Sequence, residues 1–243
     1  MNTREAAAKV MVALDKPDAA EALRVAEALR PFGCWVKIGM ELFYAGGPDI
    51  VRECRRLGFR IFVDLKLHDI PNTVKGAARS LARLGADMIN VHAAGGTEMM
   101  RAAAEGAAEG AEAAGLAAPP LIVAVTQLTS TTREMMNEEI GIPGEVEDVV
   151  VRYAMLAKRA GLHGVVASPL EAAAVKRACG RDFLAVTPGI RPAGHAAGDQ
   201  RRIATPLEAL RAGADFLVVG RPVTAASDPA AALEQILKEM TEA

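Results

Sequence analysis

The chain alternates short apolar segments with longer amphipathic ones. Stretches of helical period, rich in Ala, Glu, Arg and Leu, occupy regions such as 19–30, 73–84 and 146–160. Apolar or β-branched runs that suit buried strands separate them, at 10–14, 35–38, 60–65, 87–91, 121–125, 164–167, 184–186 and 216–219. Because continuously apolar strands are typical of parallel sheets covered on both faces, this alternation predicts repeated βα units.

A short motif of Arg, any residue and Gly recurs just before four of the predicted strands. A glycine suits the left-handed position after a helix, and an arginine in the last turn complements the helix dipole. The copies are Arg56-Leu57-Gly58, Arg83-Leu84-Gly85, Arg159-Ala160-Gly161 and Arg211-Ala212-Gly213. Eight such units without a dinucleotide-binding fingerprint predict an α/β fold, a closed (β/α)8 TIM barrel rather than an open sheet. No linker divides the 243 residues, so we expect one catalytic domain over 1–243.

The amino-acid composition argues against several classes of function. The 28 basic and 30 acidic residues nearly cancel, and only 4% of residues are aromatic, which leaves no basic surface or stacking platform for nucleic acid. Three cysteines without C-x-x-C spacing predict neither a disulfide framework nor a zinc cluster and suit a reducing compartment. The start of the chain does not resemble a signal peptide, and no apolar run suits a membrane span. We therefore expect a cytoplasmic protein that binds neither nucleic acid nor membrane.

Polar residues gather where the predicted strands end, which is where barrels of this kind carry their chemistry. They are Asp15, Lys37, Asp64, Lys66, Asn90, His92, Thr126, Thr129, Thr187 and Arg221. The densest group is the segment 64–69, Asp-Leu-Lys-Leu-His-Asp. Alternate side chains share one face of a strand, so Asp64 and Lys66 should point the same way, about 7 Å apart along the chain.

Two interpretations of this group are open. In the first interpretation, Asp64 and Lys66 form a buried structural ion pair, while Asp69 or Thr73 stabilises the start of the next helix. Alternatively, the charges form a catalytic array. Lys37, near the end of the neighbouring strand, favours the second interpretation, because an alternating Lys, Asp, Lys, Asp array is costly to desolvate without a functional return.

Glycine and arginine follow the last two predicted strands, in the segments 187–191 and 218–222. Exposed glycine N–H groups and the planar arginine fork bind oxyanions, and barrels often bind phosphate at these two strand ends. We therefore predict a phosphate site that includes Arg221. The segment 192–200 has the composition of a lid, which would bring Gln200 to the same anion. No histidine pair has metal-ligand spacing, so we expect no metal site.

Seven ordered motifs resemble the orotidine 5'-phosphate decarboxylase family over essentially the whole chain. They are Ala13-Leu14-Asp15, 36–39 (VKIG), 64–73 (DLKLHDIPNT), 90–96 (NVHAAGG), 126–130 (TQLTS), 187–191 (TPGIR) and Val219-Gly220-Arg221. The resemblance implies a homodimeric barrel enzyme that converts orotidine 5'-phosphate to uridine 5'-phosphate and carbon dioxide. This is the last step of pyrimidine nucleotide synthesis, and the resemblance implies no metal or organic cofactor for it.

The same resemblance implies roles for individual residues. Lys66 is the expected proton donor, and Asp64 is expected against the substrate carboxylate. Lys37 and Asp69 complete the array, with Asp69 and Thr73 entering the neighbouring subunit's site. The remaining implied contacts are Asp15 and Lys37 with the ribose, Thr129 with the base, Gln200, Gly220 and Arg221 with the phosphate, and Arg191 at the gating loop.

Two rival functions remain open at this point. A magnesium-dependent sugar-phosphate lyase of the hexulose-phosphate synthase or ketogulonate-phosphate decarboxylase type resembles the chain in its Asp-x-Lys-x-x-Asp core. Those relatives have an acidic residue where Lys37 stands, so Lys37 argues against them. An inactive barrel that senses a phosphorylated ligand is the second rival, and the intact array of lysines and aspartates argues against it.

Overall fold

A closed parallel barrel forms the centre of the molecule. The computed structural model describes residues 1–192 and 202–241, and its eight strands pair in sequence order until β8 closes on β1. The strands are β1 (Val10–Ala13), β2 (Trp35–Gly39), β3 (Arg60–Leu67), β4 (Met88–His92), β5 (Leu121–Val125), β6 (Gly164–Val166), β7 (Leu184–Thr187) and β8 (Phe216–Val219). This confirms the (β/α)8 TIM barrel.

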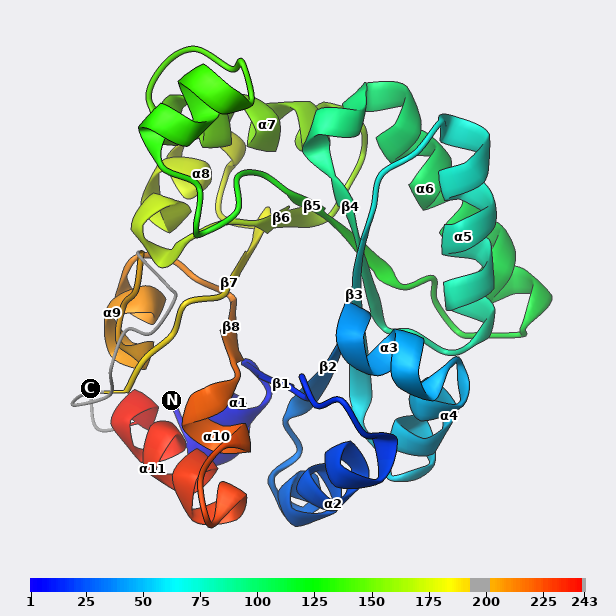
Figure 1. Ribbon diagram of the computed structural model, residues 1–243, viewed down its shortest axis with the longest axis vertical. Helices are drawn as coiled ribbons and strands as arrows, with labels where there is room; N and C mark the ends of the chain where they lie inside the picture. The colour runs from blue at the N-terminus through cyan, green and yellow to red at the C-terminus, as the bar shows by residue number, and fades with distance from the viewer. Residues whose placement is uncertain (193–201, 242–243) are drawn as a thin grey trace.

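Helices surround the barrel on its outside (Figure 1). The α-helices are α1 (Thr3–Ala7), α2 (Ala19–Leu29), α3 (Met40–Gly46), α4 (Asp49–Arg56), α5 (Pro71–Arg83), α6 (Gly96–Ala113), α7 (Val146–Arg159), α8 (Ala172–Cys179), α9 (Pro206–Arg211), α10 (Arg221–Thr224) and α11 (Pro229–Thr241). Short helical turns are η1 (Arg30–Phe32), η2 (Ala93–Gly95), η3 (Met135–Glu139) and η4 (Pro169–Glu171). Among the described residues, no helix is both long and apolar enough to cross a membrane.

The predicted elements match the structure to within about two residues at their ends. The largest extension is in β3, predicted over 60–65 and observed to Leu67. The glycines of the recurring motif, Gly58, Gly85, Gly161 and Gly213, have φ values of 91°, 90°, 83° and 102°. They take the left-handed conformation that the motif predicts after a helix end.

Apolar side chains cover both faces of the barrel sheet. The barrel interior holds a small apolar cluster that includes Met11, Trp35, Phe62 and Met88. The neighbouring strand positions point outward into the larger core between sheet and helices, as Val12 does beside Met11. This alternation fills the interior with side chains, so a ligand of the barrel strands has to bind at an end of the barrel.

Helices α5 and α6 pack closely because two glycines of α6 face the backbone of α5. A Cβ atom at Gly106 would overlap the carbonyl of Lys75, and one at Gly110 would overlap the carbonyl of Arg79. Ion pairs reinforce the contact, with Lys75 Nζ lying 2.8 Å from Glu109 Oε1. This packing supports the helix that directly follows β3, the strand that carries the densest charge.

We predict that Gly106→Ala destabilises the fold, although alanine favours helix by about 1 kcal/mol. The added methyl group has to displace the α5 backbone, and overpacking of this kind costs about 1–3 kcal/mol. Ala108→Gly, at an exposed position of the same helix, measures the propensity contribution alone. Denaturant unfolding checks both variants, and an increase in the stability of Gly106→Ala would contradict the close-packing argument.

Candidate active site

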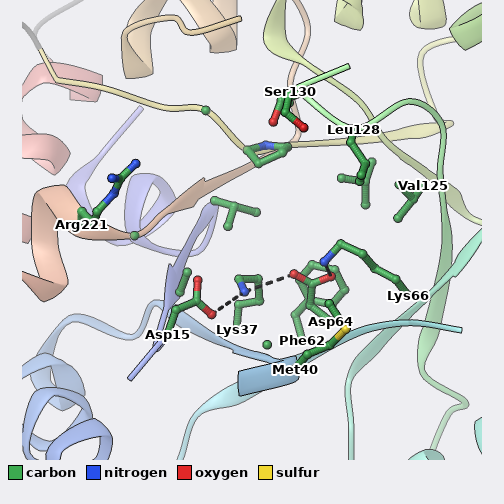
Figure 2. A pocket seen from close by; sticks show the side chains of 18 of the residues that line it. Asp15, Lys37, Met40, Phe62, Asp64, Lys66, Val125, Leu128, Ser130 and Arg221 are labelled. Carbon is green, nitrogen blue, oxygen red and sulfur yellow. Dashed lines mark hydrogen bonds and ion pairs between the residues drawn. The ribbon is translucent and has the colours of Figure 1, made fainter. Parts of the chain in front are cut away.

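A cavity of about 570 Å³ opens at the carboxyl end of the barrel. Residues in or just after β1, β2, β3, β5, β6, β7 and β8 line it, and Figure 2 shows several of their side chains facing one another across the opening. The polar lining residues are Asp15, Lys37, Glu41, Asp64, Lys66, Gln127, Thr129, Ser130, Arg191, Arg221 and Thr224. The cavity therefore lies where the sequence analysis expected the chemistry.

Four ionisable side chains form a continuous array on one wall (Figure 2). Lys37 Nζ lies 2.9 Å from Asp15 Oδ1 and 3.1 Å from Asp64 Oδ2. Lys66 Nζ lies 2.7 Å from Asp64 Oδ1. Each oxygen of the Asp64 carboxylate thus faces a different ammonium group.

Burial makes this array strongly coupled. Only 6% of Lys37 and 8% of Asp64 is exposed. Burial by itself raises the pKa of the Asp64 carboxyl, but the charges of Lys37 and Lys66 and hydrogen bonds from Lys66 and Asn90 outweigh it and lower the pKa. Burial likewise disfavours the Lys37 ammonium, and the attraction of Asp64 and Asp15 raises its pKa above the ordinary range. The carboxylate and the ammonium are therefore both held in their charged forms.

Asn90, in the middle of β4, holds the array through two hydrogen bonds. Its Nδ2 donates to Asp64 Oδ1 at 2.7 Å, and its Oδ1 accepts from the Lys66 backbone N–H at 2.8 Å. Asn90 is 1% exposed, so these hydrogen bonds form in a site that excludes water. Asn90 was expected near a strand end but was not among the expected site residues; a lone amide within an otherwise apolar strand was the available signal.

The backbone of Lys66 departs from the regular strand that the sequence analysis expected. Its φ is 52°, the only positive value among the described residues other than glycine, and the β3–β4 register shifts between Val63 and Leu67. The side chains of Asp64 and Lys66 nevertheless share the cavity face and meet, as expected, while Leu65 packs against the outer core. A non-glycine residue in this conformation costs about 1–3 kcal/mol, which Asn90 and Asp64 offset by holding its N–H and its ammonium.

We predict that Asn90→Ala releases the Lys66 backbone. In the wild-type protein the Lys66 amide is partly buried and hydrogen-bonded to Asn90, so it should exchange slowly with solvent. The variant should exchange this amide about fivefold faster or more, since the lost hydrogen bond is worth about 1 kcal/mol or more. Amide exchange followed by NMR checks this.

Thr126→Val is the matched control, because Thr126 ends the neighbouring strand β5 and its hydroxyl donates to Val166 rather than to the array. The control should leave the Lys66 amide protected. Equal protection of that amide in wild-type and Asn90→Ala proteins would show that Asn90 does not hold it.

Arginines and glycines that follow β7 and β8 line another part of the cavity. Gly189, with φ 83°, and Arg191 follow β7, while Gly220 and Arg221 follow β8. Arg191 is 8% exposed, and its Nη1 donates to the Ile190 carbonyl at 2.9 Å. In Figure 2 Arg221 and Lys66 stand on opposite sides of the cavity, so an anionic group bound by Arg221 would lie away from the lysine array.

The segment after β5 completes the lining. Gln127, Leu128, Thr129 and Ser130 all contribute to the cavity wall. Only Thr129 was among the expected site residues, and the motif 126–130 that contains all four was the signal for the others. Their hydroxyl, amide and backbone groups suit a polar planar ligand such as a nucleobase.

Asp69 and Thr73 do not join the array within this chain. Both are exposed and outside the cavity lining, because β3 ends at Leu67 and the following turn leads away from the barrel mouth to α5. Asp69 Oδ1 accepts from the Ile70 N–H at 2.7 Å. Gln200, with the rest of 193–201, lies outside the described residues. Among the residues that the structure does describe, no group of three or more His, Cys, Asp or Glu side chains could hold a metal ion.

The family model of the orotidine 5'-phosphate decarboxylase / HUMPS family matches residues 8–236. An orotidine 5'-phosphate decarboxylase from Moorella thermoacetica is 56% identical over 233 residues, covering 96% of this chain and 92% of that protein. One from Maridesulfovibrio salexigens is 50% identical over 232 residues, with coverage of 96% and 98%.

Solved structures give the same result. The crystal structure of orotidine 5'-phosphate decarboxylase from Lactobacillus acidophilus matches with a TM-score of 0.83 at 41% identity, covering 96% of this chain and 98% of that one. An uncharacterized conserved protein from Geobacillus kaustophilus matches with a TM-score of 0.81 at 45% identity, with coverage of 96% and 100%. This chain belongs to the orotidine 5'-phosphate decarboxylase / HUMPS family.

Proposed function

We propose that this protein decarboxylates orotidine 5'-phosphate to uridine 5'-phosphate and carbon dioxide, the last step of pyrimidine nucleotide synthesis. The observation that carries the proposal is the buried Lys37–Asp64–Lys66 array in the cavity wall. The relatives named above, half or more identical over nearly the whole chain, support the same reaction. Residues 1–243 act as one catalytic domain in this proposal, and the cytoplasm is its compartment.

The reaction requires stabilisation of a carbanion that the substrate itself cannot delocalise. When the bond between the ring carbon and the carboxylate breaks, carbon dioxide leaves and the electron pair stays in the ring plane, outside the π system. A fixed ammonium group beside that carbon lowers the energy of the developing charge. Lys66 supplies this charge and then transfers a proton from Nζ to the carbon, which forms the C–H bond of the product. Solvent returns the proton to Lys66.

Asp64 serves this chemistry in two ways. Its carboxylate bonds to both lysines and so fixes the Lys66 ammonium before substrate arrives, which removes the cost of reorganisation during the reaction. In the proposed complex its negative charge also lies against the substrate carboxylate, the group that departs without charge as carbon dioxide. The lowered pKa of Asp64 keeps it ionised at neutral pH.

The substrate's remaining groups are assigned to the other cavity walls. Asp15 and Lys37 bind the ribose, Thr129 binds the base, and Arg221 and Gly220 bind the phosphate, together with Gln200 and with Arg191 at the gating loop. Arg221 stands away from Lys66 across the cavity, as expected if phosphate and reacting carbon occupy different ends. Binding energy from the remote phosphate can then be used at the reacting carbon.

The magnesium-dependent lyase is less consistent with this site. Such an enzyme needs carboxylates that are available to a cation. Here Lys37 pairs with both Asp15 and Asp64, and Lys66 pairs with Asp64. The carboxylates are thus neutralised by lysines, which favours the decarboxylase.

We predict that Lys66→Ala lowers kcat by about 10³-fold or more, since it removes the central electrostatic group and the proton donor. Binding of uridine 5'-phosphate should change much less, because Arg221 and the base-side residues remain. Loss of orotidine 5'-phosphate absorbance measures turnover. Lys158→Ala, on the outer helix α7, is the control. Near-normal turnover by folded Lys66→Ala protein would refute the assignment.

We further propose a homodimer in which Asp69 and Thr73 enter the partner's cavity. Both side chains are exposed in the segment that runs from β3 into the first turn of α5, and Ile70 between them is an apolar residue that is 67% exposed. A two-fold dimer repeats the same contact on both subunits, so each chain can lend this segment to the other. Asp69 would thereby complete the alternating series Lys37, Asp64, Lys66 and Asp69.

The shared site predicts complementation between two inactive variants. Lys66→Ala and Asp69→Ala subunits should exchange to give heterodimers in which one site carries both changes and the other carries neither. The intact site should restore up to about half of the wild-type activity per heterodimer, because one of two symmetric sites is complete. Heterodimers verified by mass spectrometry that stay as inactive as both parents would place Asp69 in its own chain's site.

A further inference from the structure

Arg202 makes an unusual set of contacts next to the cavity. Its Nη2 donates to the Leu128 carbonyl at 2.6 Å and its Nε to the Thr129 carbonyl at 3.4 Å. Its Nη1 pairs with Glu171 Oε1. The mechanism above uses neither Arg202 nor Glu171, although Leu128 and Thr129 line the cavity.

Glu171 is a rigid anchor for this arginine. It is 4% exposed, and its second oxygen, Oε2, accepts from the Ser168 N–H at 2.8 Å. Ser168 is fully buried and directly follows Ala167, which itself lines the cavity. Burial raises the pKa of the Glu171 carboxyl, and the Arg202 charge opposes that rise. The Arg202 guanidinium is therefore held in place by Glu171, in the helical turn η4 that follows β6.

Arg202 also lies near the residues that follow β7, on the side of the cavity that is expected to bind phosphate. Two residues later, Ala204 bridges to Ile190, and its carbonyl accepts from the Arg191 N–H at 2.9 Å. Gly189 and Arg191, on either side of Ile190, line the cavity. The Arg202 guanidinium thus connects the parts of the wall that follow β5 and β6, and the backbone at Ala204 ties the same segment to the part that follows β7.

The contacts to two successive carbonyls fix two peptide planes. A peptide unit is planar, and in a trans unit the N–H points opposite to the C=O. The structure contains no cis peptide among its described residues. With the carbonyls of Leu128 and Thr129 turned to Arg202, the N–H groups of Thr129 and Ser130 point away from it. These two residues line the base side of the cavity.

We propose that Arg202 is a positioning residue that sets the orientation of the base-binding segment 128–130 by holding its carbonyls against the Glu171 anchor. It recognises no part of the ligand itself. Its effect is to present the Thr129 and Ser130 peptides to the planar, hydrogen-bonding base of a pyrimidine nucleotide. This inference rests on the proposed function, since it takes the ligand to be a nucleoside monophosphate.

Two ligands separate a role in base recognition from a role in phosphate binding. Uridine 5'-phosphate carries both groups, whereas ribose 5-phosphate lacks the base. Arg202→Ala should weaken uridine 5'-phosphate binding by about tenfold or more, because the strong hydrogen bonds of the charged guanidinium no longer orient the base-side peptides. Ribose 5-phosphate should bind with less than about a threefold change, since its contacts lie elsewhere. Isothermal titration calorimetry measures both.

Two conservative variants test the same role without removing a whole side chain, so that a loss of folding does not decide the result. Arg202→Lys retains the charge but cannot reach three acceptors with one ammonium group, and Glu171→Gln retains the shape of the anchor without its charge. Both should weaken the nucleotide selectively, by less than Arg202→Ala. Arg133→Ala is the matched control, because Arg133 is exposed just beyond the same segment and pairs only with Glu145 at 2.9 Å among the described contacts of its side chain.

Equal weakening of both ligands would overturn the inference, since Arg202 would then act through the phosphate segment. Unchanged binding of both ligands by the folded variants would overturn it as well. The proposed function fails in a different way: wild-type protein would then bind neither ligand and would not turn over orotidine 5'-phosphate. In that case this inference falls with it.

Discussion

The pairing of one buried carboxylate with two ammonium groups is the constraint on which the site depends. Asp64 and Lys37 are almost fully withdrawn from water, and an unpaired charge at either position would cost several kcal/mol. Each charge is tolerated because the others are present. Since the folded-state pKa of Asp64 is lowered, the ionised carboxylate stabilises the fold at neutral pH. That contribution is lost only as the pH falls through the depressed value.

The barrel supplies the geometry that this pairing needs. Lys37 and Asp64 come from adjacent parallel strands, and the β2–β3 register places Gly39 opposite Asp64. A Cβ atom at Gly39 would approach Lys37 Nζ and Asp15 Oδ1, so the bare glycine leaves space for the ion pair. Asn90 from the next strand supports Lys66 in its left-handed backbone conformation. Three neighbouring strands thus hold the array before any ligand is bound.

Much of this arrangement could be predicted from the sequence. The apolar runs and the Arg-x-Gly motif gave the strands and helices, because buried parallel strands and left-handed helix ends leave strong local patterns. Strand ends then indicated Asp15, Lys37, Asp64 and Lys66. The bulge at Lys66 could not be predicted, since it depends on hydrogen bonds to Asn90, 24 residues away. The Arg202–Glu171 anchor was missed for the same reason, because its members belong to three separate loops.

The central claim is that Asp64 is a preformed anion between two lysines in the free protein. Titration of its carboxyl carbon by ¹³C NMR, assigned with the Asp64→Asn variant, tests this directly. The account predicts that Asp64 remains ionised well below the ordinary aspartate pKa of about 3.9. A titration at or above that ordinary value would contradict the account, because burial would then outweigh the lysines and the array would not be held in its charged form.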